Sequence, residues 1–405
     1  MLINSFITSQ DIFWINIISD IFSFWEKMSD LLILQLTRFT IKMKEEELLY
    51  LIALKKTPLI GDITAKKLIT HFKSAKNIFS QKKSTFENID GIGEKISRNL
   101  LKSEYLHEAE TELNLAQKNN IKICCFTDDD YPDLLKQCVD GPIFFYQRGN
   151  IDLKNKRILS IVGTRNITPY GKAFCEKLIE DLAPLDVVIV SGFAYGVDIT
   201  AHKAAIDQNL QTIACLAHGL NMVYPQVHSK YCEAIEEYGG FITDFGFQCK
   251  FDRKNFLSRN RIIAGLSEAT IVIESGAKGG SLVTADIAFS YNREVFAVPG
   301  RATDTYSVGC NDLIRVEKAR ILTSAKDLLY HLNWGPTSKP IQQLFIELSF
   351  EEEKIHNYLK NNGKQQLDII AFECQIPVYQ TSNLLFQLEM KNIIRPLPGK
   401  MFEVI

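Results

Sequence analysis

Between residues 121 and about 331, short runs of apolar and β-branched residues alternate with longer segments whose apolar residues recur at helical spacing. Such runs are typical of buried parallel strands, and the segments between them are typical of helices that return the chain to the next strand. The alternation predicts an α/β fold with a Rossmann-like, doubly wound and mostly parallel sheet. The predicted strands span 157–163, 186–192, 212–219, 240–245, 269–275, 294–300 and 319–324.

Residues 43–120 have a different pattern, in which short amphipathic segments are separated by turns. In the stretch IDGIGEKISRNLL, 89–101, Gly91 and Gly93 flank Ile92 directly before an apolar helix. Glycines at such a turn allow backbone N–H groups to meet a phosphate at the helix N-terminus. We predict a helical domain of the helix-hairpin-helix or SAM-like type, while a tight turn without a ligand explains the two glycines equally well.

After residue 331 the alternation stops, and a stretch rich in glycine and proline predicts a linker over 332–344. Residues 345–405 then show three helical patterns and a terminal hairpin turning at Pro398 and Gly399, which predict a winged helix. Its third helix has only Lys391 as a basic residue, so packing or protein interaction is favoured over the reading of DNA bases. The three predicted helices span 351–362, 367–373 and 378–392.

The first 42 residues are apolar and aromatic, but charged residues interrupt any membrane span of about 20 residues. They also lack the basic start and the small-residue cleavage site of a secretory signal. We interpret 1–42 as an artefact of start-site assignment or a loosely packed appendage, with the chain proper beginning near Met43. The interrupting residues are Asp11, Asp20, Glu26, Lys27 and Asp30.

The composition limits the class of protein and the ligands that it could bind. With 405 residues, of which 46% are hydrophobic and 23% charged, the chain resembles an ordinary globular protein of two or three domains. A net charge of −2 excludes a uniformly positive surface but leaves room for a local basic patch. The nine cysteines form no C-x-x-C pair and the histidines have no zinc spacing, so we expect reduced thiols, a cytoplasmic location and no metal.

Three glycine-containing loops follow predicted strands, over 162–173, 191–205 and 275–288. Each joins a strand to a helix, where bare N–H groups and the helix dipole favour an anion, although ordinary tight turns explain several of the glycines. Neither G-x-G-x-x-G nor G-x-x-x-x-G-K-[ST] occurs, so no dinucleotide or P-loop cofactor is expected. The candidate ligand contacts are Gly163, Thr164, Arg165, Ser191, Gly192, Gly280 and Ser281.

A local basic patch lies in the stretch KFDRKNFLSRNR, 250–261, where five cations accompany one acid. An aromatic residue beside cations is the arrangement that stacks a nucleic-acid base while holding its phosphate. A solvated loop with its phenylalanines in the core is the alternative interpretation. The candidates for ligand contact are Lys250, Lys254, Phe256, Arg259, Asn260 and Arg261.

No pattern for covalent catalysis is present. G-x-S-x-G is absent, and no loop shows a Ser/His/Asp or Cys/His arrangement. Asp198 and His202 lie one helical turn apart, but ordering of the first turn by Asp198 is favoured over an acid/base role for the pair.

Taken together, these motifs closely resemble those of the bacterial DNA-processing protein A (DprA/Smf) family. The resemblance covers about 120–325 and preserves the order of many separate motifs. They are DDDYPDLLKQCVDGPIFFYQRGN, VGTR, SGFAYGVDITAH, NMVYP, NFLSRNRIIAGLS, GGSLVTA, EVFAVPG and GCNDLI.

The resemblance implies a binding protein rather than an enzyme. Members hold single-stranded DNA on the Rossmann-like domain, commonly as homodimers, and help to load the RecA recombinase onto incoming DNA during natural transformation. Carried over to this sequence, the DNA contacts would be Gly163 to Arg165, the Ser191–Gly192 turn and Arg259 to Arg261. Phe256 would offer a stacking face, and Lys250 and Lys254 would extend the track.

Two other functions are compatible with the pattern. The GGSLVTAD stretch is also similar to the phosphate loop of nucleoside-monophosphate phosphoribohydrolases, with Asp286 in the position of their carboxylate. However, Leu282 and Val283 replace the Gly-Thr pair of that loop, so its phosphate cradle is damaged. The third possibility is a surface that mediates recombinase contacts without binding DNA.

Overall fold

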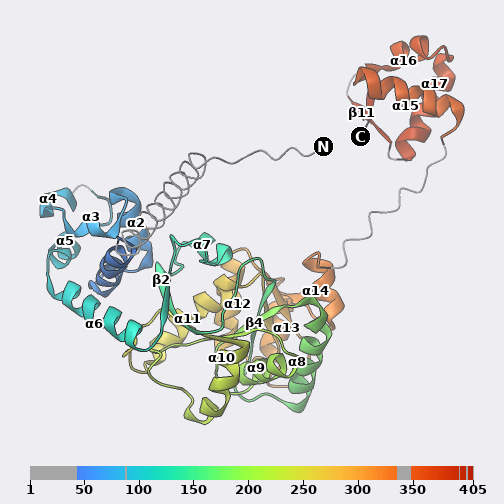
Figure 1. Cartoon of the computed structure of the whole chain (residues 1–405). Coiled ribbons are helices and arrows are strands. Elements are labelled where there is room, and N and C mark those ends of the chain that lie inside the picture. The colour runs from blue at the N-terminus through green and yellow to red at the C-terminus, as the bar shows by residue number, and fades with distance from the viewer. Residues whose placement is uncertain (1–42, 87–88, 335–347, 392, 398–399, 405) are drawn as a thin grey trace, which may run out of the picture. The chain divides into compact units, whose positions relative to one another are not determined.

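The computed structural model describes residues 43–86, 89–334, 348–391, 393–397 and 400–404. The predicted extension 1–42, most of the predicted linker 332–344 and the predicted turn at Pro398 and Gly399 lie outside the described residues. The chain divides into two compact units, Met1–Asp327 and Leu328–Ile405. Figure 1 follows the elements of each unit along the chain.

In the described part of the first unit, nine strands form one sheet in the order β1-β2-β6-β5-β4-β3-β7-β8-β9. The seven strands from β6 to β9 in this order pair in parallel, whereas β1 and β2 pair antiparallel at one edge. The strands are β1 (Lys122–Cys125), β2 (Phe144–Gly149), β3 (Ile158–Val162), β4 (Val188–Ser191), β5 (Thr212–Cys215), β6 (Gly239–Thr243), β7 (Ala269–Val272), β8 (Glu294–Ala297) and β9 (Arg320–Ile321).

This topology confirms the predicted α/β class and its mostly parallel sheet, and each of the seven predicted strands overlaps one of β3 to β9. The sequence analysis missed β1 and β2. They pair antiparallel with each other, about 20 residues apart in the chain, and β2 also pairs with the distant β6. Neither strand is therefore part of the local alternation of strand and helix that predicts the others.

The order of the strands reverses at β3. The chain leaves β3 through β4 and β5 to β6 on one side and then returns to β7 on the other side. Right-handed crossovers therefore place helices α8, α9 and α10 on one face and α11, α12 and α13 on the other. These helices are α8 (Pro169–Leu182), α9 (Val197–Asp207), α10 (Cys232–Tyr238), α11 (Arg253–Leu266), α12 (Gly280–Ser290) and α13 (Val308–Arg315).

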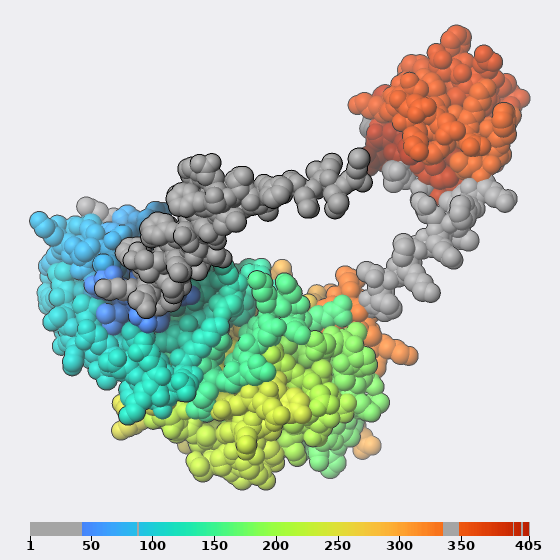
Figure 2. Space-filling model, viewed as in Figure 1, coloured from blue at the N-terminus to red at the C-terminus, as the bar shows by residue number. Residues whose placement is uncertain are grey.

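A helical segment precedes the sheet, and its helices share a hydrophobic core with it. Leu54 and Leu68 of this segment pack in one cluster with Phe144 and Phe241 of β2 and β6. Figure 2 shows the surface of the segment, blue to cyan, continuing into that of the sheet. The helix-hairpin-helix type of this segment stays a prediction, although Gly91 does adopt a positive φ of 82°. The helices span 43–56, α2 (Asp62–Phe72), α3 (Ala75–Phe79), α4 (Lys83–Phe86), α5 (Glu94–Leu100) and α6 (Glu104–Lys118).

A buried ionic cluster joins the helical segment to the sheet. One guanidinium nitrogen of Arg261 donates to Asp62 at 3.0 Å and also to Asp244. Lys55 lies 3.3 Å from both carboxylates, so two cations share two acids. Burial opposes ionisation of Asp62, but the charges of Lys55 and Arg261 outweigh it and lower the pKa of that carboxyl.

We expect Arg261→Met to lower the free energy of unfolding by about 2 kcal/mol, because Lys55 still compensates part of the buried charge. A lowered pKa means that Asp62 stabilises the fold above its unfolded pKa and loses this contribution as the pH falls through the folded value. Arg261→Met removes one cause of the lowering, so acid unfolding should begin at a higher pH. Urea titrations from pH 7 down to pH 3 test this shift. Equal losses for mutant and wild type at every pH would contradict it.

The second unit contains a small α/β fold with its own core of aliphatic side chains, including Ile355, Leu385 and Ile394. Its three helices match the predicted ones, and β11 pairs with β12 antiparallel. The winged-helix assignment stays a prediction. Among the residues described, no helix combines the length and apolarity needed to span a membrane. The elements from the unit boundary onward are α14 (Ala325–His331), α15 (Phe350–Asn362), β10 (Gln365–Gln366), α16 (Leu367–Glu373), α17 (Val378–Met390), β11 (Ile394–Leu397) and β12 (Met401–Val404).

Candidate nucleic-acid interface

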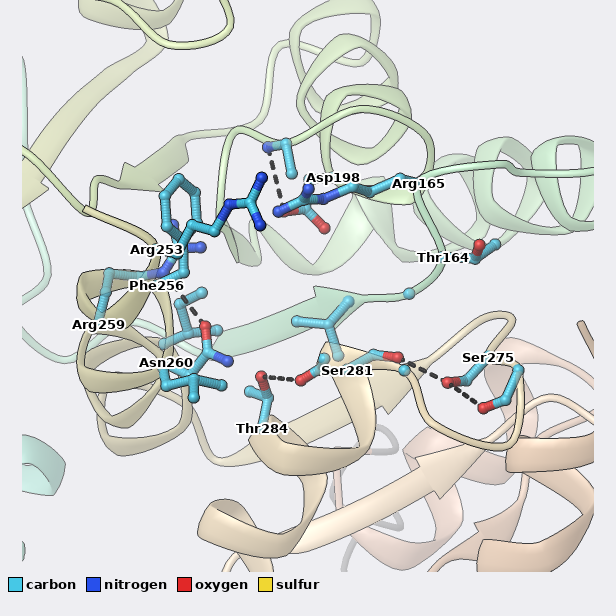
Figure 3. A pocket seen from close by; sticks show the side chains of 18 residues that line it. Thr164, Arg165, Asp198, Arg253, Phe256, Arg259, Asn260, Ser275, Ser281 and Thr284 are labelled. Carbon is cyan, nitrogen blue, oxygen red and sulfur yellow. Dashed lines mark hydrogen bonds between the residues drawn. The ribbon is translucent and has the colours of Figure 1, made fainter. Parts of the chain in front are cut away.

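A cavity of about 380 Å³ opens at the carboxyl ends of β3 and β7, where the strand order reverses. Ligands of open α/β sheets bind at this position, because loops on opposite faces diverge there and leave a crevice. The loops after β3, β4 and β7 and the first turns of α11 and α12 supply the lining (Figure 3). All three predicted glycine loops and the basic stretch therefore contribute residues to one cavity.

The loop after β3 is held by close backbone contacts that only glycine permits. A Cβ on Gly163 would lie 2.4 Å from Val197 Cγ2 and 3.0 Å from the carbonyl oxygen of Glu274. This closeness lets Thr164 N–H donate to that carbonyl at 2.8 Å, while Val197 N–H donates to Thr164 O at 3.1 Å. The loop is thus fixed to β7 on one side and to α9 on the other. Its next residue, Arg165, is left facing the cavity.

Two exposed arginines and one aromatic ring form the positively charged side of the cavity. The guanidinium carbon of Arg165 lies 5.7 Å from the ring centre of Phe256. Arg253 precedes Phe256 by three residues on α11, so both side chains lie on one face of that helix. In the described part of the chain, neither arginine has a carboxylate oxygen within 4.0 Å. Their charges therefore remain available to an anionic ligand.

The opposite side of the cavity is formed by hydroxyl groups and bare backbone. Figure 3 shows Ser281 and Thr284 across the opening from Arg165 and Arg253. Ser281 Oγ donates to Ser275 Oγ at 2.9 Å, and nothing lies within 4 Å of the space that a Cβ on Gly280 would occupy. Hydroxyls and unobstructed backbone are suited to contact a sugar or a phosphate oxygen.

Arg259 and Asp198 form the buried floor between these sides. Arg259 is only 4% exposed, and its Nη1 donates to the carbonyl oxygen of Gly192 at 2.7 Å and to that of Cys215. Burial lowers the pKa of Arg259 and raises that of Asp198, while each charge partly offsets the shift of the other. Asp198 accepts from Ala194 N–H at 3.2 Å. The pair therefore fixes the loop after β4 beneath the cavity.

The sequence of residues 122–333, which form this sheet and its loops, matches the family described as DNA recombination-mediator protein A. The chain belongs to this family. The membership confirms the resemblance to DprA/Smf proteins that the motifs predict.

Two relatives and one solved structure show how far the family likeness extends. Protein Smf of Synechocystis is 31% identical over 298 residues, which cover 73% of this chain and 75% of that protein. A putative DNA processing protein DprA of Mycobacterium tuberculosis is 30% identical over 327 residues, or 76% and 84% of the two chains. The X-ray structure of DNA processing protein A from Streptococcus pneumoniae superposes with a TM-score of 0.60 and 30% identity, covering 69% of this chain and 95% of that one.

The structure brings most of the predicted family contacts to the cavity. Those that line it are Gly163, Thr164, Arg165, Phe256, Arg259, Asn260, Gly280 and Ser281. Lys250, before α11, and Lys254, in its first turn beside Arg253, are exposed but do not line the cavity themselves. They remain predicted contacts for a longer ligand.

Three predicted contacts are placed elsewhere. Ser191 is fully buried and donates its hydroxyl to Ile161 O at 2.6 Å. Gly192 does not line the cavity either and packs closely against the buried pair, since a Cβ there would lie 2.6 Å from Asp198 Oδ2 and 2.7 Å from Arg259 Nη2. Arg261 points to the ionic cluster with Asp62 and Asp244, since two positions along a helix separate it from Arg259 by about 200°. None of these three residues therefore lines the cavity with the other predicted contacts.

Sequence reasoning missed Arg253 as a site residue, although it noted the basic stretch. The signal was present: Arg253 and Phe256 are three residues apart, which places them together on a helix. Ser275 and Thr284 were also missed, because a hydroxyl residue after a strand or in a helix has many ordinary roles.

One group of donor atoms in the described residues has metal-like spacing. Cys124, Asp128 and Asp130 bring one ligand atom each within 4.8 Å of the others. However, Lys44 pairs with Asp128 at 2.9 Å and Lys122 pairs with Asp130, and burial raises the pKa of the Cys124 thiol. The cluster is an ion-paired corner of the fold, and we assign no ion to it.

Proposed function

We propose that this protein binds single-stranded DNA in the cavity at the carboxyl ends of β3 and β7. The observation that carries the proposal is the pair of arginines, Arg165 and Arg253, beside the half-buried ring of Phe256. Cations next to an aromatic ring hold the phosphate and stack the base of one nucleotide. The proposal also fits the family to which the chain belongs.

A single strand fits this site better than a duplex. The cavity of about 380 Å³ has its aromatic ring inside its lining. In a duplex, both faces of each base are already stacked, so such a ring has no free face to contact.

Membership of the family supports a wider role. We infer that the protein is a recombination mediator that protects incoming DNA in the cytoplasm and helps to load the RecA recombinase during natural transformation. We further infer that it acts as a homodimer. Binding and release of a strand, rather than a chemical step, would then be its function.

The enzymatic alternative finds little support in the position of its carboxylate. Asp286 lies exposed on α12, pairs with Lys318 at 2.7 Å and does not line the cavity. Glu274, which lies deeper, accepts bonds from the N–H and hydroxyl of Thr168. Release of free base from a nucleotide by the wild type, abolished in Asp286→Asn, would revive this alternative.

The proposal is tested by fluorescence anisotropy with labelled poly-dT and with a matched duplex at low and moderate salt. We expect tighter binding of the single strand, with an affinity that falls steeply as salt rises. Arg165→Ala should weaken binding about tenfold for any base sequence and reduce the steepness of the salt dependence. Lys154→Ala, at the amino end of β3 and thus at the opposite edge of the sheet, is the charge-matched control. Equal binding by the Arg165→Ala and control proteins would remove Arg165 from the site.

A further inference from the structure

A second cavity, of about 340 Å³, lies beside α9. It is formed by the start of α8, the loop after β4, α9 and the segment 226–231. None of its residues belongs to the predicted site. The side chains that matter here are Lys172, Tyr195, Lys203, His228, Lys230 and Tyr231.

This second cavity adjoins the first one. Ala194 lines the first cavity and its neighbour Tyr195 lines the second, so the linings of the two cavities meet at consecutive residues. Helix α9 also lies between the two cavities, because Asp198 lines the first whereas Thr200 and Lys203 line the second. A flexible chain that leaves the Arg165 side of the first cavity therefore meets the second cavity next.

The second cavity is lined by three lysines and by no carboxylate. Lys203 Nζ and Lys230 Nζ lie 5.8 Å and 5.1 Å from the ring centre of Tyr231. Within the described residues, neither of these two ammonium groups has a carboxylate oxygen within 4.0 Å, whereas Lys172 lies 3.8 Å from Glu176. Two positive charges thus stand unneutralised over one aromatic ring.

The aromatic side chains of this cavity offer stacking faces. Tyr195 is 47% exposed, and its ring centre lies 5.0 Å from that of His228. Burial lowers the pKa of His228, whose Nδ1 lies 3.1 Å from Phe193 O, and thus favours the uncharged imidazole. Exposed tyrosine beside lysines repeats the chemistry of Phe256 beside arginines in the first cavity.

A different charged cavity, which begins at Glu274 beside Ser275 of the first cavity, is less suited to a polyanion. It includes Arg301 and two tyrosines, but the carboxylates of Glu274 and Asp304 also line it. These acids would repel a phosphate, and repulsion at this range opposes the attraction of a single arginine. The balance of charge therefore favours the lysine-lined cavity.

We propose that the second cavity binds the next phosphodiester segment of the same single DNA strand, with Lys203 and Lys230 on its phosphates and Tyr195 against a base. This inference rests on the proposed function of the first cavity. It makes the protein a two-segment binder, whose affinity rises when a strand is long enough to occupy both cavities. A strand that fills only the first cavity gains nothing from the lysines.

Oligonucleotides of two lengths distinguish binding in the first cavity alone from binding in both cavities. Anisotropy is measured with dT oligomers of about 6 and about 20 nucleotides, a range typical of single-strand sites. For Lys203→Ala/Lys230→Ala, we expect about a tenfold loss of affinity for the long oligomer and a shallower salt dependence, with binding of the short one unchanged. Lys118→Ala/Lys154→Ala removes two exposed lysines that line neither cavity and controls for net charge. Unchanged binding of the long oligomer, or equal losses for both lengths, overturns the inference.

The outcomes also distinguish a failure of this inference from a failure of the proposed function on which it rests. If wild type binds neither oligomer, the proposed function itself fails. If Arg165→Ala weakens the binding of both oligomers while the lysine variant behaves as wild type, the first cavity keeps its proposed function and only the inference about the second cavity fails. Protection of Lys203 and Lys230 from acetylation by the long oligomer supports a strand site. Equal protection by dTMP at the same phosphate concentration overturns it in favour of a free-nucleotide site.

Discussion

Arg259→Ala is expected to lower the free energy of unfolding by about 3–5 kcal/mol, because it removes one member of a buried pair of opposite charges. The variant leaves Asp198 buried without its attracting cation. It also leaves the carbonyl oxygens of Gly192 and Cys215 without the donors that Arg259 supplies. Urea unfolding followed by circular dichroism gives the difference. A loss of less than 1 kcal/mol would contradict a structural role for this arginine.

The cause of the loss can be isolated with Asp198→Asn. An asparagine keeps an oxygen that accepts from Ala194 N–H but carries no charge to bury. The double variant Arg259→Ala/Asp198→Asn should therefore be more stable than Arg259→Ala alone, and the double-mutant cycle measures the coupling. Strict additivity of the two single losses would show that the charges do not interact.

The stability lost in Arg259→Ala should depend on pH in a definite direction. Burial raises the pKa of Asp198 and the charge of Arg259 counteracts it, so removal of Arg259 raises the pKa further. A carboxyl whose folded pKa lies above its unfolded value loses stability as the pH rises, until it is ionised in the fold as well. The deficit of Arg259→Ala should therefore be smaller at pH 5 than at pH 8. This result would separate a folding defect from the loss of a DNA contact.

Much of the fold was accessible from the sequence because its signals are local. Each parallel strand is a short apolar run followed by a helical segment, and this pattern predicted β3 to β9 within a few residues. The antiparallel strands β1 and β2 have no such neighbour, since what stabilises them is long-range pairing with β6 and packing against the helical segment. Long-range pairing of this kind produces no local periodicity of hydrophobic residues from which the strands could be predicted.

The site was predictable in outline but not in the direction of each side chain. Residue type places Arg259 and Arg261 in one basic stretch, yet one forms the cavity floor and the other pairs with Asp62 of the helical segment. Only the position of the helix axis decides which face meets the crevice, and that position depends on tertiary packing. Arg253, exposed at the first turn, therefore carries the free charge that Arg259 was expected to carry.

Gly196→Ala is expected to lower the free energy of unfolding by about 3 kcal/mol and to abolish single-strand binding at micromolar protein. Gly196 has a φ of 72°, which L side chains rarely adopt. Its Cβ would also lie 2.2 Å from the carbonyl oxygen of Thr164 and 2.6 Å from the backbone of Arg165. Because these obstacles are backbone atoms, the loop that presents Arg165 has to move. Denaturant unfolding and anisotropy with poly-dT measure the two effects.

Gly280→Ala is the matched control, because it adds the same methyl group at the opposite wall of the cavity. No atom lies within 4 Å of that methyl, so stability should change by less than about 0.5 kcal/mol. If DNA approaches the backbone at the start of α12, binding should nevertheless weaken several-fold, since the methyl occupies the space of the ligand. Loss of binding without loss of stability in Gly280→Ala, beside loss of both in Gly196→Ala, places the strand between Arg165 and α12. Full binding by Gly280→Ala would instead confine the strand to the arginine side of the cavity.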